Sequence, residues 1–346
     1  MKTILTIVLI CFGINIFADN FIDISKGLDG KVNCFIEYKG RILAGGSFVV
    51  KGSDIRGIAA WDGKKWERVG KGISDGVIMC FFKHNDELYV GGDFTLDGIN
   101  KNVSVAKWNG EKWDAVGGRF NNLVWTLCVF KNEIYAAGLF TKVENEIVNY
   151  IAKWNGKKWE EIGGGTNKNI FCLMVYRDEL YAGGSFTQAG SATIQYLAKW
   201  NGSQWSKCHN GVDGMVNNMA IYNDRLYICG YFSKTGDVAA SCIASWDGNS
   251  FFPLEGIDVD YYISKMTVVG DKLIITGKFS HLTKISRTNG LAHWDGKIWK
   301  SISNDSFNTI HTIYGFNNFV YVGGEDSKAS DIYKTKILQI SNLKNY

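Results

Sequence analysis

The amino-acid sequence predicts an all-β fold built from one repeated four-stranded unit, and three observations lead to this prediction. First, the 346 residues include 40 glycines and a single proline, which fits many short strands joined by tight turns. Second, pairs of tryptophans flank an Asn-Gly or Asp-Gly turn, as in WNGEKW at residues 108–113. Third, an apolar run that ends in two small residues and a phenylalanine precedes each such turn, as in LYVGGDF at residues 88–94.

Both signals recur with one period along the chain. The first tryptophans of the turns are 46 to 48 residues apart, at Trp61, Trp108, Trp154, Trp200, Trp246 and Trp294. The phenylalanines keep the same period, at Phe48, Phe94, Phe140, Phe186, Phe232 and Phe279. Four-stranded units of about 40–50 residues that repeat around an axis are typical of a β-propeller.

The second unit illustrates the strands that we expect in every blade. Its segments 77–84, 87–94, 104–108 and 112–116 have the apolar and β-branched composition of strands and are bounded by turn residues. The Asn-Gly and Asp-Gly turns supply the positive φ angles of a tight hairpin, so the flanking tryptophans pack across it. Pro253 falls in the fourth, outermost strand of the fifth blade, where a missing backbone donor is tolerated.

The two ends of the chain favour a closed ring of seven blades over an open solenoid. A seventh unit begins at Thr309, but the chain stops at Tyr346 before a fourth strand can form. Residues 21–28, FIDISKGL, align with residues 66–73, WERVGKGI, which form the fourth strand of the first blade. We therefore expect the N-terminal strand to complete the seventh blade.

The repeat pattern GGxF followed by AxW(D/N)GxxW resembles known propeller repeats. It looks like the kelch and galactose-oxidase type, and it is similar to repeats of secreted bacterial propellers and of the fungal cortical polarity-marker family. The resemblance covers essentially the whole chain after residue 18, and it implies an extracytoplasmic, non-catalytic role. The two histidines and two tyrosines that bind copper in galactose oxidase have no counterparts here, so we expect no cofactor.

The N-terminus has the composition of a secretory signal peptide. Residues 1–20, MKTILTIVLICFGINIFADN, contain one lysine, an apolar run from Ile4 to Phe17 and then Ala18 before a polar segment. We expect cleavage near Ala18, a mature propeller over residues 19–346, and a secreted, periplasmic or cell-surface location. The run is too short to span a bilayer as a transmembrane helix. The alternative to a signal peptide is therefore a buried N-terminal helix.

Charge and composition exclude several partners. The net charge is only +4 and no basic run is present, so the sequence lacks the electrostatic signature of nucleic-acid binding. No segment is apolar enough for a membrane span, and we expect a monomer. The partners that remain are a glycan, a peptide or a protein.

The cysteines do not form a recognisable framework. Seven remain after cleavage, an odd number that argues against a complete set of disulfides. Cys34, Cys80 and Cys172 share one position in three blades, but other residue types fill it elsewhere and metal-ligand spacings are missing, so we expect no metal. Cys229 and Cys242 lie on adjacent expected strands and are the one pair that could form a disulfide.

The candidate binding site lies where the innermost strands meet the face with longer loops. One position of these strands is uniformly apolar, at Val32, Ile78, Val124, Ile170, Val216, Ile263 and Ile310, and we interpret it as packing. The next residue points the other way in a strand and varies, as Asn33, Met79, Trp125, Phe171, Asn217, Ser264 and His311. Of these we predict five as ligand-binding residues, Asn33, Trp125, Phe171, Asn217 and His311, because aromatic rings stack on ligands and amides donate and accept hydrogen bonds. Irregular packing between blades is the alternative interpretation of this position.

Two main functions remain open from the sequence, and a structural-repeat role within a larger cell-surface assembly is a third option that the sequence does not separate from a binding role. The first is an exported, non-catalytic binding propeller whose long-loop face recognises a glycan, peptide or protein. The second is a propeller-based hydrolase or lyase that acts at the mouth of the channel. Catalysis would require an acid and a base within hydrogen-bond reach of one reacting bond.

Overall fold

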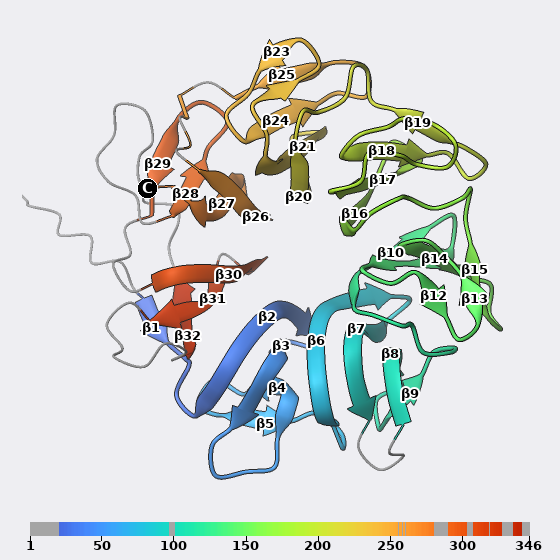
Figure 1. Ribbon diagram of the computed structural model, residues 1–346. Coiled ribbons are helices and arrows are strands. Elements are labelled where there is room, and N and C mark those ends of the chain that lie inside the picture. Colours follow the sequence, from blue (N-terminus) through green and yellow to red (C-terminus); the bar gives the residue numbers. More distant parts are fainter. Residues whose placement is uncertain are drawn as a thin grey trace, which may run out of the picture.

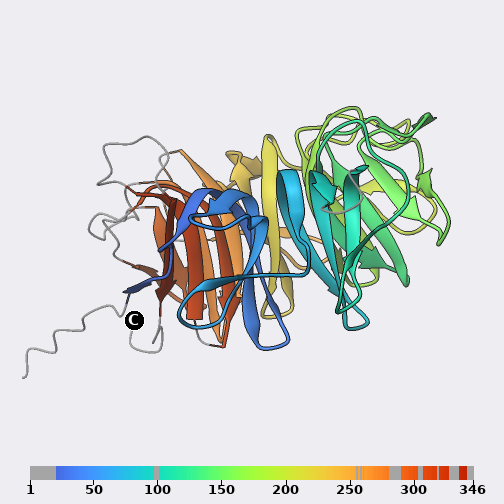
Figure 2. The same cartoon turned by 90° about the horizontal axis from the view of Figure 1, so that it is seen from below.

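The computed structural model describes residues 21–96, 101–254, 256–257, 259, 261–279, 290–302, 307–317, 319–326 and 335–340. The expected signal peptide, residues 1–18, lies outside them. The described residues form strands, turns and loops, and seven four-stranded antiparallel sheets are arranged as a ring around a central axis (Figure 1). The ring is a seven-bladed β-propeller, as the repeats predicted, and Figure 2 shows the same disc from the side.

Each blade runs from an innermost to an outermost strand in chain order, except that the outermost strand of blade 7 comes from the N-terminal part of the chain. Blade 1 is β2 (Leu28–Tyr38), β3 (Arg41–Val50), β4 (Arg56–Trp61) and β5 (Trp66–Arg68), and blade 2 is β6 (Ile73–His84), β7 (Glu87–Leu96), β8 (Lys101–Trp108) and β9 (Trp113–Ala115). Blade 3 is β10 (Val124–Phe130), β11 (Glu133–Gly138), β14 (Ile151–Trp154) and β15 (Trp159–Glu161), and blade 4 is β16 (Ile170–Tyr176), β17 (Glu179–Gly184), β18 (Leu197–Trp200) and β19 (Trp205–Lys207).

The remaining blades follow the same order. Blade 5 is β20 (Met215–Tyr222), β21 (Arg225–Tyr231), β24 (Ile243–Trp246) and β25 (Phe251–Pro253), and blade 6 is β26 (Tyr262–Val269), β27 (Lys272–Lys278), β28 (Leu291–Trp294) and β29 (Trp299–Ser301). Blade 7 is β30 (Phe307–Phe316), β31 (Phe319–Asp326), β32 (Thr335–Ile340) and β1 (Phe21–Asp23). Small hairpins, β12 (Lys142–Val143) with β13 (Glu146–Ile147) and β22 (Lys234–Thr235) with β23 (Val238–Ala239), extend the connections after the second strands of blades 3 and 5. Among the described residues, none lies in a helix long and apolar enough to cross a membrane.

The ring closes as the chain ends predicted. Strand β1 pairs with β32, with Phe21 opposite Ile340, just as Trp66 of β5 pairs with Trp61 of β4 in blade 1. The N-terminal strand is therefore the outermost strand of the last blade. Pro253 also lies as expected, in β25, which pairs only with β24.

The repeated tryptophans connect neighbouring blades. Within each turn the two rings pack at a tilt, as in Trp108 and Trp113, whose centroids are 5.2 Å apart. In blades 1 to 3 the second indole donates a hydrogen bond to a carbonyl after the outermost strand of the preceding blade, whereas the buried indole nitrogens of Trp205 and Trp299 have no hydrogen-bond partner among the described residues. Trp113 Nε1 donates to the Val69 carbonyl at 3.2 Å, and Trp66 donates to that of Ile24 across the ring closure at 2.7 Å. In these three blades the turn therefore anchors one blade to the blade before it by a hydrogen bond, and in blades 4 to 6 the second ring, Trp205, Phe251 or Trp299, contributes buried apolar packing.

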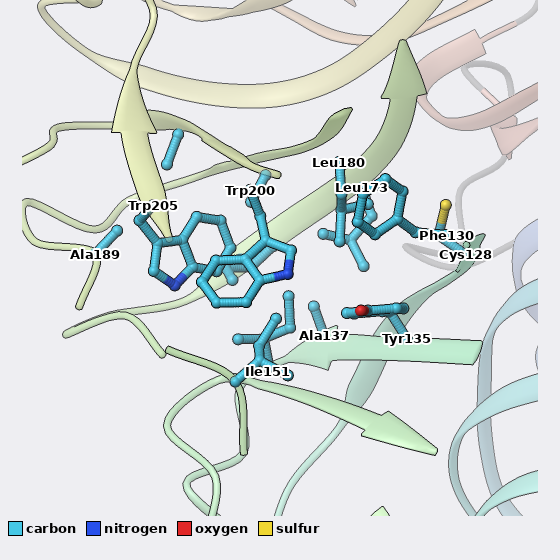
Figure 3. Close-up of a cluster of buried hydrophobic side chains, with 14 of the residues drawn as sticks. Cys128, Phe130, Tyr135, Ala137, Ile151, Leu173, Leu180, Ala189, Trp200 and Trp205 are labelled. Atoms are coloured by element: carbon cyan, nitrogen blue, oxygen red, sulfur yellow. The ribbon is translucent and has the colours of Figure 1, made fainter. Parts of the chain in front are cut away.

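Between blades, apolar side chains form continuous cores. Figure 3 shows the core between blades 3 and 4, where Phe130 and Tyr135 face Leu173, with Trp200 and Trp205 beside them. Trp200 and Trp205 are only 5% and 8% exposed, so the outer edge of this core is closed by the tryptophan pair.

Every innermost strand contains a β-bulge at one equivalent position. In blade 1, Val32 pairs with Gly46 and Cys34 pairs with Gly45, so Asn33 has no partner across the strand. The same register shift occurs in the other six innermost strands, at Met79, Trp125, Phe171, Asn217, Ser264 and His311. A bulge redirects a side chain away from the regular pleat. The sequence predicted simple strand alternation at this position; the structure corrects this to a bulge.

The glycine that follows the first small residue of the repeat makes the bulge possible. A Cβ at Gly46 would meet the Lys31 carbonyl and lie 3.0 Å from Val32 Cα, both of them backbone atoms. Gly230 of blade 5 is confined in the same way by the backbone of Met215 and Val216. A glycine recurs at this position of the repeats because the bulge in the neighbouring strand leaves no room for a Cβ atom there.

Candidate functional site

The seven bulge residues converge on one pocket in the centre of the ring. Its volume is about 400 Å³, and it is lined by Asn33, Met79, Trp125, Phe171, Met215, Asn217, Ser264, Lys265 and His311. All five predicted ligand-binding residues are among them. Asn217 lies near the start of β20, far from the tight turn that joins β20 to β21, so the pocket opens toward the long-loop face. We call it the channel-mouth pocket.

Two aromatic rings form one wall of the channel-mouth pocket. Trp125 of blade 3 and Phe171 of blade 4 meet edge to face, with centroids 5.1 Å apart and an interplanar angle of 86°. Both side chains are partly exposed. Trp125 is the one tryptophan outside the repeated turns, so it is not needed to anchor a blade.

The two asparagines, Asn33 and Asn217, both connect neighbouring blades and form a polar part of the pocket wall. Asn33 Nδ2 donates to the Ile78 carbonyl of blade 2 at 3.0 Å, and Asn217 Nδ2 donates to the Ile263 carbonyl of blade 6 at 3.1 Å. Each amide thereby ties its bulge to the next blade, as the packing interpretation expects. Within the described part of the chain neither amide oxygen has a hydrogen-bond partner, so both remain acceptors for a ligand.

The other side of the pocket carries a histidine and a serine. His311 Nε2 lies 3.0 Å from Glu325 Oε1, and Lys31 Nζ lies 3.8 Å from the same oxygen. Ser264 donates to the Thr276 carbonyl at 3.1 Å. The carboxylate of Glu325 holds the imidazole in one orientation, with Nδ1 left for other contacts.

Sequence reasoning missed two residues of this pocket, Lys265 and Met215. Lys265 follows the bulge of blade 6, at the position filled by Cys34, Cys80, Thr126, Cys172, Asn218 and Thr312 in the other blades. It is the one charged residue among these seven. The difference between Lys265 and the uncharged residues of the other blades can be seen in the sequence. Only the structure shows that Lys265 lines the pocket.

Of the cysteines at this position, Cys34 and Cys172 are buried thiols and Cys80 is partly buried. Cys34 Sγ and Cys172 Sγ lie 3.7 and 3.9 Å from the carbonyls of Gly45 and Gly183 in the paired strand. Cys229 and Cys242 are both free thiols, so the structure does not support the disulfide considered from the sequence. Over the described residues, no three His, Cys, Asp or Glu side chains gather as a metal site.

A second pocket lies between blades 5 and 6 and shares a wall with the first. Its volume is about 730 Å³, and Met215 lines both pockets. Tyr231 and Tyr261 line the second pocket and are 54% and 55% exposed, while Met215 is 38% exposed. Asp213 lies at its edge but accepts hydrogen bonds from the Ser233 hydroxyl and backbone, as a turn residue does. We call this second pocket the side groove.

Comparison with known proteins identifies the family. Residues 23–176 and 173–341 each match the Rax2 C-terminal β-propeller domain. The chain belongs to this family. The two matches meet in β16, so each spans about half of this Rax2-type ring. No curated protein matches the chain.

One solved structure supports the same architecture. The Rax2-type propeller is similar to the computationally designed Ika8 protein, with a TM-score of 0.52 and 12% sequence identity. The match covers 90% of this chain and 97% of the designed one. Identity this low shows the fold alone. The finer resemblance to kelch and galactose-oxidase repeats stays a prediction.

Proposed function

We propose that this protein is an exported, non-catalytic binding propeller whose channel-mouth pocket recognises a glycan. A peptide or a protein surface is the other occupant that the sequence left open. Export rests on the signal-peptide composition of residues 1–18. The observation that carries the proposal is the convergence of seven bulge residues, which no blade needs for its own pairing, on one concave pocket.

The chemistry of the pocket favours a sugar. Trp125 and Phe171 present apolar ring surface, on which the C–H face of a pyranose packs well. The free oxygens of Asn33 and Asn217 accept hydrogen bonds, and sugar hydroxyls are donors. A pocket of about 400 Å³ is in the usual size range for small-ligand sites.

A broad glycan array, with Trp125→Ala beside the wild type, tests the proposal. Phe252→Ala is the matched control, because Phe252 is also a partly exposed ring, 37% accessible, but lies in the outermost strand β25. We expect glycan binding to be lost in Trp125→Ala and kept in Phe252→Ala. The unfolding temperature of Trp125→Ala should equal that of the wild type, so that the loss of binding does not result from unfolding. Absence of binding, or binding that ignores Trp125, would contradict the proposal and favour a protein partner.

One observation favours the second function, a hydrolase or lyase. His311 held by Glu325 at 3.0 Å resembles the base and its orienting carboxylate in many enzymes. Incubating the array's bound glycans with the protein, followed by mass spectrometry, distinguishes the two functions. A binding propeller leaves them intact, whereas cleavage that disappears in His311→Gln would establish catalysis.

A further inference from the structure

We propose that the ligand of the channel-mouth pocket is an acidic glycan, and that Lys265 binds its carboxylate or sulfate group. This inference rests on the proposed function and narrows the class of ligand. It starts from the position of Lys265, which pairs with Thr276 directly after the bulge at Ser264 and lines the pocket with it.

Lys265 introduces one positive charge into an otherwise neutral ring. The equivalent residues of the two neighbouring blades are Asn218 and Thr312, and neither can carry charge. Asn218 instead caps the chain beside Lys265, accepting a hydrogen bond from Met266 N at 3.0 Å. The strand around Lys265 is thereby fixed by its neighbour while the ammonium group itself is left to the pocket.

Nothing in the described part of the protein neutralises this ammonium group. Lys265 forms no ion pair and no hydrogen bond with the described residues. Glu325 is the one carboxylate seen beside a lining residue, and it already contacts His311 and Lys31. The pocket lining itself contains no acid.

The thiols near Lys265 do not supply a counter-charge either. Burial raises the pKa of Cys80 and of Cys172 to about 12, although the charge of Lys265 pulls both pKa values the other way. Both thiols therefore stay neutral at physiological pH. Lys265 is half-buried among uncharged groups. An anion that binds there interacts more strongly with the ammonium group than it would on an open surface, because less water screens the charges.

The rest of the lining indicates which anion fits. One lysine without an arginine fork suits a singly charged acid group better than a phosphate, which favours carboxylate or sulfate. The rings of Trp125 and Phe171 and the amide oxygens suit the uncharged remainder of a sugar. An acidic monosaccharide unit, alone or within a longer chain, combines both features.

The test uses pairs of glycans that differ only in charge. Galacturonic acid oligomers are compared with their methyl esters, and sulfated galactans with their desulfated forms, by titration calorimetry on the mature protein. We expect at least about tenfold tighter binding of one acidic form, the effect of one charge-assisted hydrogen bond. Because this comparison uses the wild type, it does not depend on any variant folding.

Variants then locate the effect. Lys265→Met, which has similar length without charge, should abolish the preference, and Lys265→Arg should retain part of it. Lys142→Met, at an exposed lysine of hairpin strand β12, controls for the general charge of the protein and should change nothing.

The failure of this inference can be distinguished from failure of the proposed function. Neutral glycans that bind through Trp125 and ignore Lys265→Met would overturn the acidic ligand but keep the glycan-binding pocket. If no glycan binds the wild type, both are wrong. A preference for acidic forms that survives in Lys265→Met would also overturn the role of Lys265.

Discussion

Replacing Gly138 with alanine should both destabilise the propeller and disturb its binding pocket. Gly138 ends β11 and pairs with Val124, while Ala137 pairs with Thr126, so Trp125 is the bulged residue opposite this step. A Cβ at position 138 would meet the Leu123 carbonyl and lie 2.8 Å from Trp125 N. Both are backbone atoms, so no side-chain rotation can relieve the overlap, and the bulge that orients Trp125 must move.

The expected cost follows from the kind of overlap. Overpacking of a well-packed site costs about 1–3 kcal/mol, and backbone contacts place Gly138→Ala at the upper end, near ~3 kcal/mol. For a domain of this size ~1 kcal/mol corresponds to about 2 °C, so we expect the unfolding midpoint to fall by about 6 °C. Glycan affinity should fall together with stability, because Trp125 is displaced.

Gly323→Ala is the matched control. Its Cβ would lie 3.0 Å from Thr312 Cγ2 and 3.2 Å from the Phe35 ring, which are side-chain atoms that can yield. Blade 3 itself carries Ala137 at the equivalent position. Differential scanning fluorimetry of both variants should show a loss of less than about 1 kcal/mol for Gly323→Ala. Equal losses for the two variants, or an unchanged midpoint for Gly138→Ala, would refute the link between glycine and bulge.

Three further predictions concern titration, thiol reactivity and ligand length. Burial, helped by the charge of Lys272, lowers the pKa of His293 to about 4. The unfolded chain therefore binds a proton near pH 6.5 that the folded chain does not, and stability should decline by about 3 kcal/mol between pH 6.5 and pH 4. Urea unfolding at several pH values should show this decline, and His293→Phe should remove most of it. Cys80 and Cys172 should not react with Ellman's reagent at pH 8 until the protein unfolds, because burial raises the pKa of each thiol to about 12. Rapid labelling of the native protein would mean that the inner ring opens. Tyr231→Ala should weaken the binding of long oligosaccharides more than that of monosaccharides, since the side groove joins the channel-mouth pocket at Met215. Equal losses for all ligand lengths, measured by calorimetry, would show that a ligand does not extend into the groove.

The blade architecture was predictable because its signals are local and repeated. Turns of Asn-Gly and Asp-Gly, apolar strands and the small pair before each phenylalanine recur with one period, so each copy supports the interpretation of the others. The complementary ends, residues 21–28 and the unit that begins at Thr309, predicted closure, and the pairing of β1 with β32 confirms it. The candidate residues of the site were predicted in the same way, from a position that varies among the blades while the residue before it is always Val or Ile.

The tertiary structure decided what that varying position is. A bulge depends on the register between two strands, and the glycine that permits it lies 13 residues away in the next strand, at Gly46 for Asn33. The alternation of side chains along a strand therefore predicted which way the Asn33 side chain points. It did not predict that Asn33 has no partner in the paired strand. The same limit explains why Asn33 and Asn217 also proved to tie their blades to the next ones.

The sequence by itself determined the number of blades, their strands and the closure of the ring, because these follow from turn chemistry and periodicity within each copy. Only the tertiary structure decided which copies face one another across the channel. It placed Lys265 without a counter-charge in the described lining, set His311 against Glu325, and made Met215 the wall shared by two pockets. Residues that lie on different blades, or on different strands of one blade, become neighbours only when the ring has formed. A local sequence pattern therefore does not show how far apart they lie in space.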